Sequence, residues 1–315
     1  MKTKLTIILA FIANMMSAQV LDRHNEILDT VCQSKLTAVY LYTIHTSDAD
    51  GNAVTDSLHL ALQVGEKVWK TWTLERYEYE KSGKDSMKIL PFLHNEALMH
   101  VATTTVGYPE GKVTTIESIV PRQYEVTEDI EKPVWKKAKG KDMVGGYQSR
   151  KATCEFRGRR WNVSYTKDIP TAAGPWKLHG LKGLITHAAD EEGIHTFQLV
   201  SINEEAVPIT RSSGYPEVAF IHDENKDATK LGTVLNPYVK VTREKILEMK
   251  NELFGDERYP NKPTFFNSWR YSFDHYNPDQ ITITQSNKDY TRTYNFKGGL
   301  YVPDKGHHYQ SLELK

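Results

Sequence analysis

The densest group of side chains able to do chemistry is an arginine cluster near the middle of the chain. Arg157, Arg159 and Arg160 flank Gly158, and Asp168 follows closely in the sequence. Guanidinium groups offer planar forks of donors, so this set could form a charged network or grip a carboxylate with two hydrogen bonds. An exposed hairpin tip with solvated or ion-paired arginines explains the same residues, and we favour that interpretation.

Histidines and carboxylates give weak candidates for catalysis. His187 and His195 stand on either side of an expected turn at residues 190–193 and could meet across a hairpin, while His307-His308 form a second pair. Zinc needs three or four ligands, so we expect no metal site and no cofactor. Acidic pairs such as Glu191-Glu192 lie at turns and show no spacing across a cleft, which does not indicate a glycosidase.

Known catalytic signatures are missing from the sequence. It contains no Gly-x-Ser-x-Gly elbow and no His-Glu-x-x-His helix. The two cysteines, Cys32 and Cys154, have no nearby histidine that would favour a reactive thiolate. They could form a disulfide across a long loop or remain two buried free thiols. The sequence therefore favours a protein without enzymatic activity.

A glycine-rich run from Gly174 to Ile185 is the most unusual local feature. Its glycines permit positive φ and close backbone approach, and its proline stiffens the entry. The run could bind a ligand or a partner strand through its backbone. We favour a tight structural corner in which Trp176 and Leu181 fill the core. The Gly-Lys-Ser/Thr ending of a phosphate loop is absent.

Composition and charge narrow the class of protein. The chain has 315 residues, with 40 basic and 40 acidic side chains. A neutral chain does not attract a polyanion over long distance, which argues against nucleic acid as the main partner. The 17 tyrosines and 6 tryptophans could line a concave sheet that holds an apolar ligand, although rings that simply fill the core are the favoured interpretation.

The first 18 residues have the pattern of a signal peptide. Lys2 and Lys4 precede an apolar run from Leu5 to Met16, and Ser17-Ala18 provide a small-residue end, so cleavage is expected before Gln19. The apolar run is short for a bilayer span, and no later stretch could cross a membrane as a helix. We expect export to the periplasm or cell envelope, or secretion.

Alternating hydrophobicity predicts strands over most of the chain. Leu58, Leu60, Leu62 and Val64 alternate with more polar residues and mark the clearest half-buried strand. We expect short helices over 21–33 and after Thr242. The fold class is therefore mainly β (α+β), with a large curved antiparallel sheet and a few short helices.

Three segments are expected in the chain. Residues 1–18 are the signal peptide, and residues 19–210 form an antiparallel β domain. Residues 211–315 form an extension with one helix and further strands, packed on the same sheet.

The central block from Tyr147 to Ile202 resembles the GLPGLI family, which comprises exported proteins of Bacteroidetes. The family's signature corresponds here to Gly180-Leu181-Lys182-Gly183-Leu184-Ile185, preceded by Gly174-Pro175-Trp176. Flanking matches are Gly146-Tyr147, Lys151-Ala152-Thr153, Phe156-Arg157-Gly158-Arg159, Trp161, Tyr165 and Asp168-Ile169-Pro170, with a weaker match from about residue 35. Lys182 replaces the signature proline, and Ser149 stands where the family often has a cysteine.

The resemblance implies an exported protein whose family has no settled activity, with a layout similar to the curved half-barrel of LolA-like carriers. The favoured function is non-enzymatic binding of an apolar or amphipathic ligand. The alternatives are a partner protein of an outer-membrane transport or secretion complex, docked through an open sheet edge or the 174–185 corner, and a hydrolase with an unrecognised site. The candidate binding residues are Arg157, Arg159, Trp161, Tyr165, Asp168, Gly174, Pro175, Trp176, Gly180, Leu181, Lys182 and Gly183.

Overall fold

The structure is a computed structural model of the whole chain. It describes residues 19–20, 28–48, 51–82, 101–119, 122–223, 228–254, 270–277, 280–287, 290–297, 307–308 and 310–315. The expected signal peptide lies outside the described residues, and so does the first part of the helix expected over 21–33.

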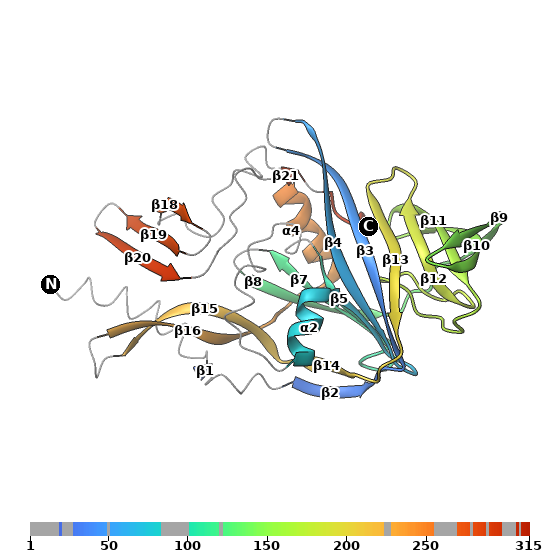
Figure 1. Cartoon of the computed structure of the whole chain (residues 1–315), viewed down its shortest axis with the longest axis horizontal. Coiled ribbons are helices and arrows are strands. Elements are labelled where there is room, and N and C mark those ends of the chain that lie inside the picture. The colour runs from blue at the N-terminus through green and yellow to red at the C-terminus, as the bar shows by residue number, and fades with distance from the viewer. Residues whose placement is uncertain are drawn as a thin grey trace.

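One large sheet organises the described chain (Figure 1). It contains 13 strands, of which β21 (His307–His308) pairs beside β3 and the rest follow one continuous order. From edge to edge that order is β17 (Val239–Lys240), β8 (Arg122–Asp129), β7 (Lys112–Ile119), β6 (Thr103–Val106), β5 (Trp69–Thr73), β4 (Ala53–Val64), β3 (Leu36–Asp48), β13 (His195–Asn203), β12 (Leu184–Asp190), β11 (Arg159–Thr166), β10 (Tyr147–Phe156) and β9 (Lys136–Val144).

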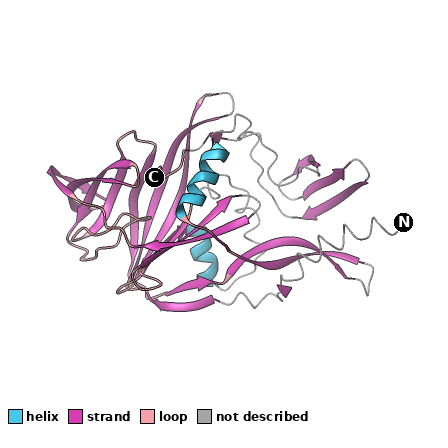
Figure 2. Cartoon of the chain, turned by 180° about the vertical axis from the view of Figure 1, so that it is seen from behind, coloured by secondary structure: helices cyan, strands magenta, loops and turns pink. Residues whose placement is uncertain are grey.

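Neighbouring strands of this sheet are antiparallel, apart from the short parallel pair β17–β8. The sheet stays open, with β17 at one edge and β9 at the other. The predicted fold class, a mainly β protein with a large curved sheet and few helices, is confirmed. Figure 2 shows how few helical elements lie among the strands.

Smaller elements surround the sheet. The two described helices are α2 (Leu74–Ser82) and α4 (Arg243–Phe254), and neither is long and apolar enough to cross a membrane. β2 (Leu28–Gln33) pairs with β14 (Pro208–Ser212). Two three-stranded sheets complete the described elements: β1 (Gln19–Val20), β16 (Ala228–Pro237) and β15 (Gly214–Asp223), and then β18 (Arg270–Asn277), β19 (Gln280–Asn287) and β20 (Tyr290–Lys297).

The helix predictions had mixed outcomes. The helix expected after Thr242 is confirmed as α4, and Thr242 caps it by accepting a hydrogen bond from the backbone N–H of Lys245. The helix expected over 21–33 is wrong at residues 28–33, which form β2. Pairing of β2 with β14 supplies backbone partners that local periodicity does not reveal. α2 was not anticipated by the sequence.

Alternation along β3 and β4 builds the core on one face of the sheet, called here the inner face. Tyr40 and Tyr42 on β3 lie opposite Leu60 and Leu58 on β4, and all four side chains are buried. The other face, called the outer face, is partly covered by α2 and by the β2–β14 pair. Trp72, for example, packs there with Tyr77 of α2.

Candidate functional site

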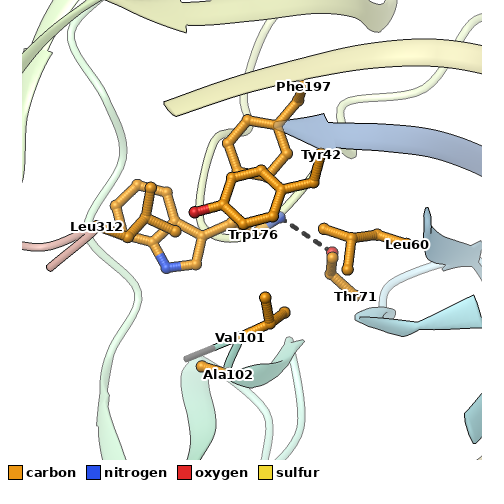
Figure 3. Close-up of a pocket in the computed structure, with 8 residues that line it drawn as sticks. All are labelled: Tyr42, Leu60, Thr71, Val101, Ala102, Trp176, Phe197 and Leu312. Atoms are coloured by element: carbon orange, nitrogen blue, oxygen red, sulfur yellow. Dashed lines mark hydrogen bonds between the residues drawn. The ribbon is translucent and has the colours of Figure 1, made fainter. Parts of the chain in front are cut away.

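The corner between β11 and β12 folds onto the inner face. Trp176 and Leu178 from this corner are buried in the main core. The backbone N–H of Trp176 donates to Thr71 Oγ1 at 3.1 Å, which ties the corner to β5 (Figure 3). Trp176 adopts a φ of +55°, a left-handed conformation that is unfavourable for a bulky side chain. The surrounding contacts must therefore hold it in place.

Two glycines explain why the corner is glycine-rich. A Cβ on Gly174 would lie 2.2 Å from the carbonyl oxygen of Leu178, and a Cβ on Gly183 would lie 2.0 Å from that of Thr166. No other residue fits such approaches without moving backbone. Gly183 also has a φ of +148°. These glycines serve close backbone contact inside the protein, as the structural interpretation predicts.

The aromatic residues of the inner face stack on one another. The ring centroids of Trp161 and Trp176 lie 5.8 Å apart, those of Phe156 and Trp176 5.9 Å, and those of Tyr42 and Phe197 4.6 Å. Such offset and tilted pairs are favourable beyond the area they bury. In this part of the sheet the aromatic side chains fill the space that a ligand would need.

A small cavity remains between these rings (Figure 3). Its volume is about 10 Å³, room for roughly one water molecule. The lining residues are Tyr42, Leu60, Thr71, Val101, Ala102, Trp176, Phe197 and Leu312. An acyl chain or a sugar does not fit this cavity as it stands.

A buried charge cluster lies beside the core. Arg157 Nη1 contacts Glu128 Oε2 at 2.9 Å and Glu313 Oε1 at 3.0 Å, while Lys177 Nζ contacts Glu128 Oε1 at 2.6 Å and Glu313 Oε2 at 2.9 Å. Arg243 of α4 also bonds Glu313. The side chains of Arg157 and Lys177 are each only 3% exposed, so these charges persist because each is matched by an opposite charge.

This cluster and the neighbouring Arg159 hold residues 310–315, called here the strap. Arg159 donates to the carbonyl oxygens of Ser311 and Leu312 at 2.5 and 3.2 Å. The backbone N–H of Leu314 donates in turn to the carbonyl oxygen of Arg157 at 3.0 Å. The strap thus crosses the β10–β11 turn, and Leu312 closes one side of the small cavity.

The placement of the arginines corrects the expected exposed hairpin tip. Arg157 and Arg159 are buried and ion-paired, and only Arg160 of the three is exposed, where it pairs with Glu191. Arg159 binds Asp190 Oδ2 at 2.7 Å. The strap covers the side chains of Arg157 and Arg159. The local turn pattern does not reveal this burial, because the strap is distant in the sequence.

Other candidate residues are scattered. Asp168 is exposed and does not join the arginines, whose partners are Asp190 and the glutamates. Trp161 and Tyr165 are core residues on β11. Pro175 and Leu181 are buried within the corner, whereas Gly180 and Lys182 are exposed on it.

The two central histidines lie on opposite faces of the sheet. His187 faces Gln198 on β13, whereas His195 shares the inner face with Phe197. His195 Nδ1 lies 2.8 Å from the hydroxyl oxygen of Tyr42. Burial, reinforced by Arg159, lowers the pKa of His195 to about 3. Among the described residues, no three metal-ligating side chains come together.

Both cysteines are free thiols. Cys154 on β10 faces Trp161 in the main core, and burial raises the pKa of its thiol to about 12. Cys32 lies on β2 beside Gly65, and burial also raises its pKa. The sequence left open a disulfide or two buried free thiols; the structure has two free thiols, of which Cys154 is buried and Cys32 only partly so. The two thiols belong to strands that do not pair with each other.

Sequence reasoning missed most of the charge cluster. Glu128, Lys177, Asp190, Arg243 and Glu313 were not singled out, because isolated charged residues usually indicate a solvated surface. Lys177 lies inside the glycine-rich run, and its place among apolar residues was the one available signal.

Comparison with known proteins adds little about this site. No family model and no curated protein sequence matches the chain. Among solved structures, the chain is similar to PNGF-II in its P21 space group, with a TM-score of 0.42 and 11% identity over 80% of this chain. It is also similar to PNGF-II in its C2 space group, with a TM-score of 0.38 and 11% identity over 79% of this chain. The chain spans 40% of the length of each of these chains, and at such TM-scores the likeness carries no argument about function.

Proposed function

We propose that this chain is an exported cell-envelope protein of the GLPGLI type that acts without enzymatic activity, as a docking partner for another envelope protein. The observation that carries this proposal is the contrast between its filled inner face and its open edge at β9. Among the described residues, the cavity in the aromatic core measures only about 10 Å³, too little for a ligand, whereas β9 pairs with a described strand on one side only and so offers backbone donors and acceptors to another chain.

The 174–185 corner is a weaker docking surface than β9. Trp176 is 4% exposed and is committed to the core, so a partner cannot reach it without unfolding the corner. The hydrolase alternative finds little support, because the exposed Asp168 and the buried His195 do not meet.

Photo-crosslinking in the producing cells tests the docking proposal. A photoreactive residue at Lys139 of β9 is expected to give one dominant protein adduct, while the same residue at Glu110, exposed in the turn before β7, gives none. The proposal fails if position 139 yields no adduct, or if both positions capture the same mixture of proteins.

A second candidate function is binding of an amphipathic carboxylate in place of the strap. Leu312 closes the apolar cavity, and the adjacent Glu313 carboxylate sits between Lys177 and Arg157. An acyl chain with a carboxylate head likewise joins an apolar part to a carboxylate, so it could occupy this site after the strap has moved.

Titration with dodecanoate tests this second candidate. Glu313→Lys places a cation against Arg157 and Lys177, which should expel the strap. Where circular dichroism shows that this variant keeps its strand content, it should bind dodecanoate at least about tenfold more strongly than the native protein. Glu204→Lys makes the same charge change at an exposed position and serves as the control. Equal binding by both variants and the native protein would exclude this candidate.

A further inference from the structure

The edge strand β9 carries an unusual concentration of positive charge. It contributes Lys136, Lys137, Lys139 and Lys141, all of them exposed. The hairpin made by β9 and β10, residues 136–156, has six basic and two acidic side chains, whereas the whole chain is neutral. A basic surface has therefore been gathered at one edge of a protein that has no overall excess charge.

These lysines are not used to hold the fold together. None of the four forms an ion pair with a described residue, and the one acid on β9, Asp142, is already bonded to Lys151 and Ser164 at 3.1 Å each. β9 also has no described strand on its outer side and lies at the far end of the molecule (Figure 1). Within the described part of the chain, the backbone groups on the side of β9 away from β10 and the four lysine charges therefore have no partner.

Two exposed apolar side chains flank the lysines. Val134 precedes β9 and is 77% exposed, and Met143 near its end is 70% exposed. Single exposed apolar residues are common. Here they stand at both ends of the basic stretch, where they could anchor a chain laid along the edge.

Lysine on an edge strand can serve simply to prevent aggregation. Both that role and a role in binding a partner require that β9 does not pair with β9 of a second copy. If β9 met β9 of a second copy, lysines would face lysines, which is destabilising. The bulge at Gly140, where φ is +105°, further disturbs regular pairing. The edge therefore disfavours its own copy and selects for opposite charge.

The arrangement of the lysines also favours an extended protein segment over a flat membrane surface as the binding partner. Lys136 and Lys137 are neighbours on a strand, so their side chains point to opposite faces of the sheet. A membrane plane could reach one of these faces at a time. An extended segment beside β9 has side chains on both faces, and acids along it could meet lysines on both.

We infer that β9 is a docking edge for an extended acidic segment of a partner protein, which adds as a further strand outside β9. This inference rests on the proposed docking function and names the chemistry of its partner. It requires both main-chain pairing and charge complementarity, and the two requirements can be tested separately.

The probe is a fluorescein-labelled nine-residue peptide of Thr, Val and Glu that contains four glutamates. Its binding to the full chain is measured by fluorescence anisotropy. We expect it to bind in low salt and to weaken as salt rises. A peptide with lysines in place of the glutamates should not bind. An acidic peptide N-methylated at alternate amides keeps its charge but cannot pair as a strand, so it should bind at least about tenfold more weakly.

Charge reversal on the protein locates the site. The double variant Lys137→Glu, Lys139→Glu should weaken binding of the acidic peptide at least about tenfold. Lys240→Glu, on the opposite edge strand β17, should leave binding unchanged. Circular dichroism checks that each variant keeps its strand content.

Several results would overturn the inference. These are no binding at millimolar acidic peptide, undiminished binding of the N-methylated peptide, or binding to phosphatidylglycerol vesicles without binding to the peptide. If crosslinking at position 139 still captures one protein, the docking function stands and only the acidic strand is rejected. If crosslinking fails while the peptide binds, the edge chemistry holds but the docking function is lost.

Discussion

Lys177 and Glu313 lie 136 positions apart in the chain, yet the Lys177 Nζ atom contacts Glu313 Oε2 at 2.9 Å inside the protein. Lys177 belongs to the corner that plugs the inner face, and Glu313 belongs to the strap. Their pairing, together with Arg157, makes the corner and the strap parts of one buried unit.

Removing the Glu313 carboxylate should destabilise the fold strongly. Glu313→Ala leaves Lys177 with the partly buried Glu128, and Arg157 with Glu128 and the exposed Glu131, and we expect the free energy of unfolding to fall by about 3 kcal/mol. Urea denaturation followed by tryptophan fluorescence measures this. Glu204→Ala, which removes an exposed carboxylate, should change stability by less than about 0.5 kcal/mol. Equal effects of the two substitutions would contradict a structural role for the cluster.

His195 should make stability depend on pH. Burial, followed by the charge of Arg159, lowers the pKa of His195 from its ordinary 6.5 to about 3. Because the unfolded chain takes up the proton first, the stability contributed by the neutral ring is complete above pH 6.5 and is lost as the pH falls toward 3.

Unfolding measured between pH 7 and pH 4 tests this dependence. The His195→Gln variant should show a shallower loss of stability on acidification than the native protein, even if it is less stable overall. His59→Gln, at an exposed position of β4, should keep the native slope. A His195→Gln variant with the native slope would refute the assignment.

Gly183 should tolerate no side chain. Gly183→Ala would place a Cβ 2.0 Å from the carbonyl oxygen of Thr166, and we expect a loss of about 3 kcal/mol or more, or failure to fold. Gly193→Ala is the matched control, since Gly193 also has a positive φ, of +71°, but has nothing within 4 Å of an added Cβ. It should lose only about 1 kcal/mol. Thermal unfolding of both variants decides, and a Gly183→Ala protein as stable as Gly193→Ala would disprove the close approach.

The cysteines should titrate as two free thiols. Without reductant, a thiol reagent in denaturant is expected to label both Cys32 and Cys154, and mass spectrometry counts the labels. In the folded protein, Cys32, which is partly exposed, should react before Cys154, which is 3% exposed. A denatured, unreduced protein with no reactive thiol would show that the two are bridged.

The sheet was predictable from sequence because alternation is local. Leu58, Leu60 and Leu62 reveal a half-buried strand without knowledge of its neighbours, and Thr242 announces the start of α4. β2 was misjudged because residues 28–33 gain their backbone partners from β14, which lies far along the chain.

The charge cluster was beyond sequence reasoning for a different reason. A buried lysine or arginine has the same local pattern as a solvated one, and only its partners distinguish the two. The partners of Arg157 come from β8 and from the strap. The corner was easier to interpret, because glycines that permit positive φ and a proline that fixes φ indicate a tight turn from local sequence alone.

The order of strands divides the main sheet at the pairing of β3 with β13. On one side, β3 to β8 lie beside one another in chain order as antiparallel neighbours, and on the other side β9 to β13 do the same. The seam itself joins Ile44 to His195 and Thr37 to Asn203. Contacts between residues far apart in the sequence form slowly, because the entropy of closing a long loop is lost before the contacts stabilise the chain. We therefore expect each half of the sheet to assemble by itself during synthesis. The pairing of β3 with β13 should form late, because it requires both halves.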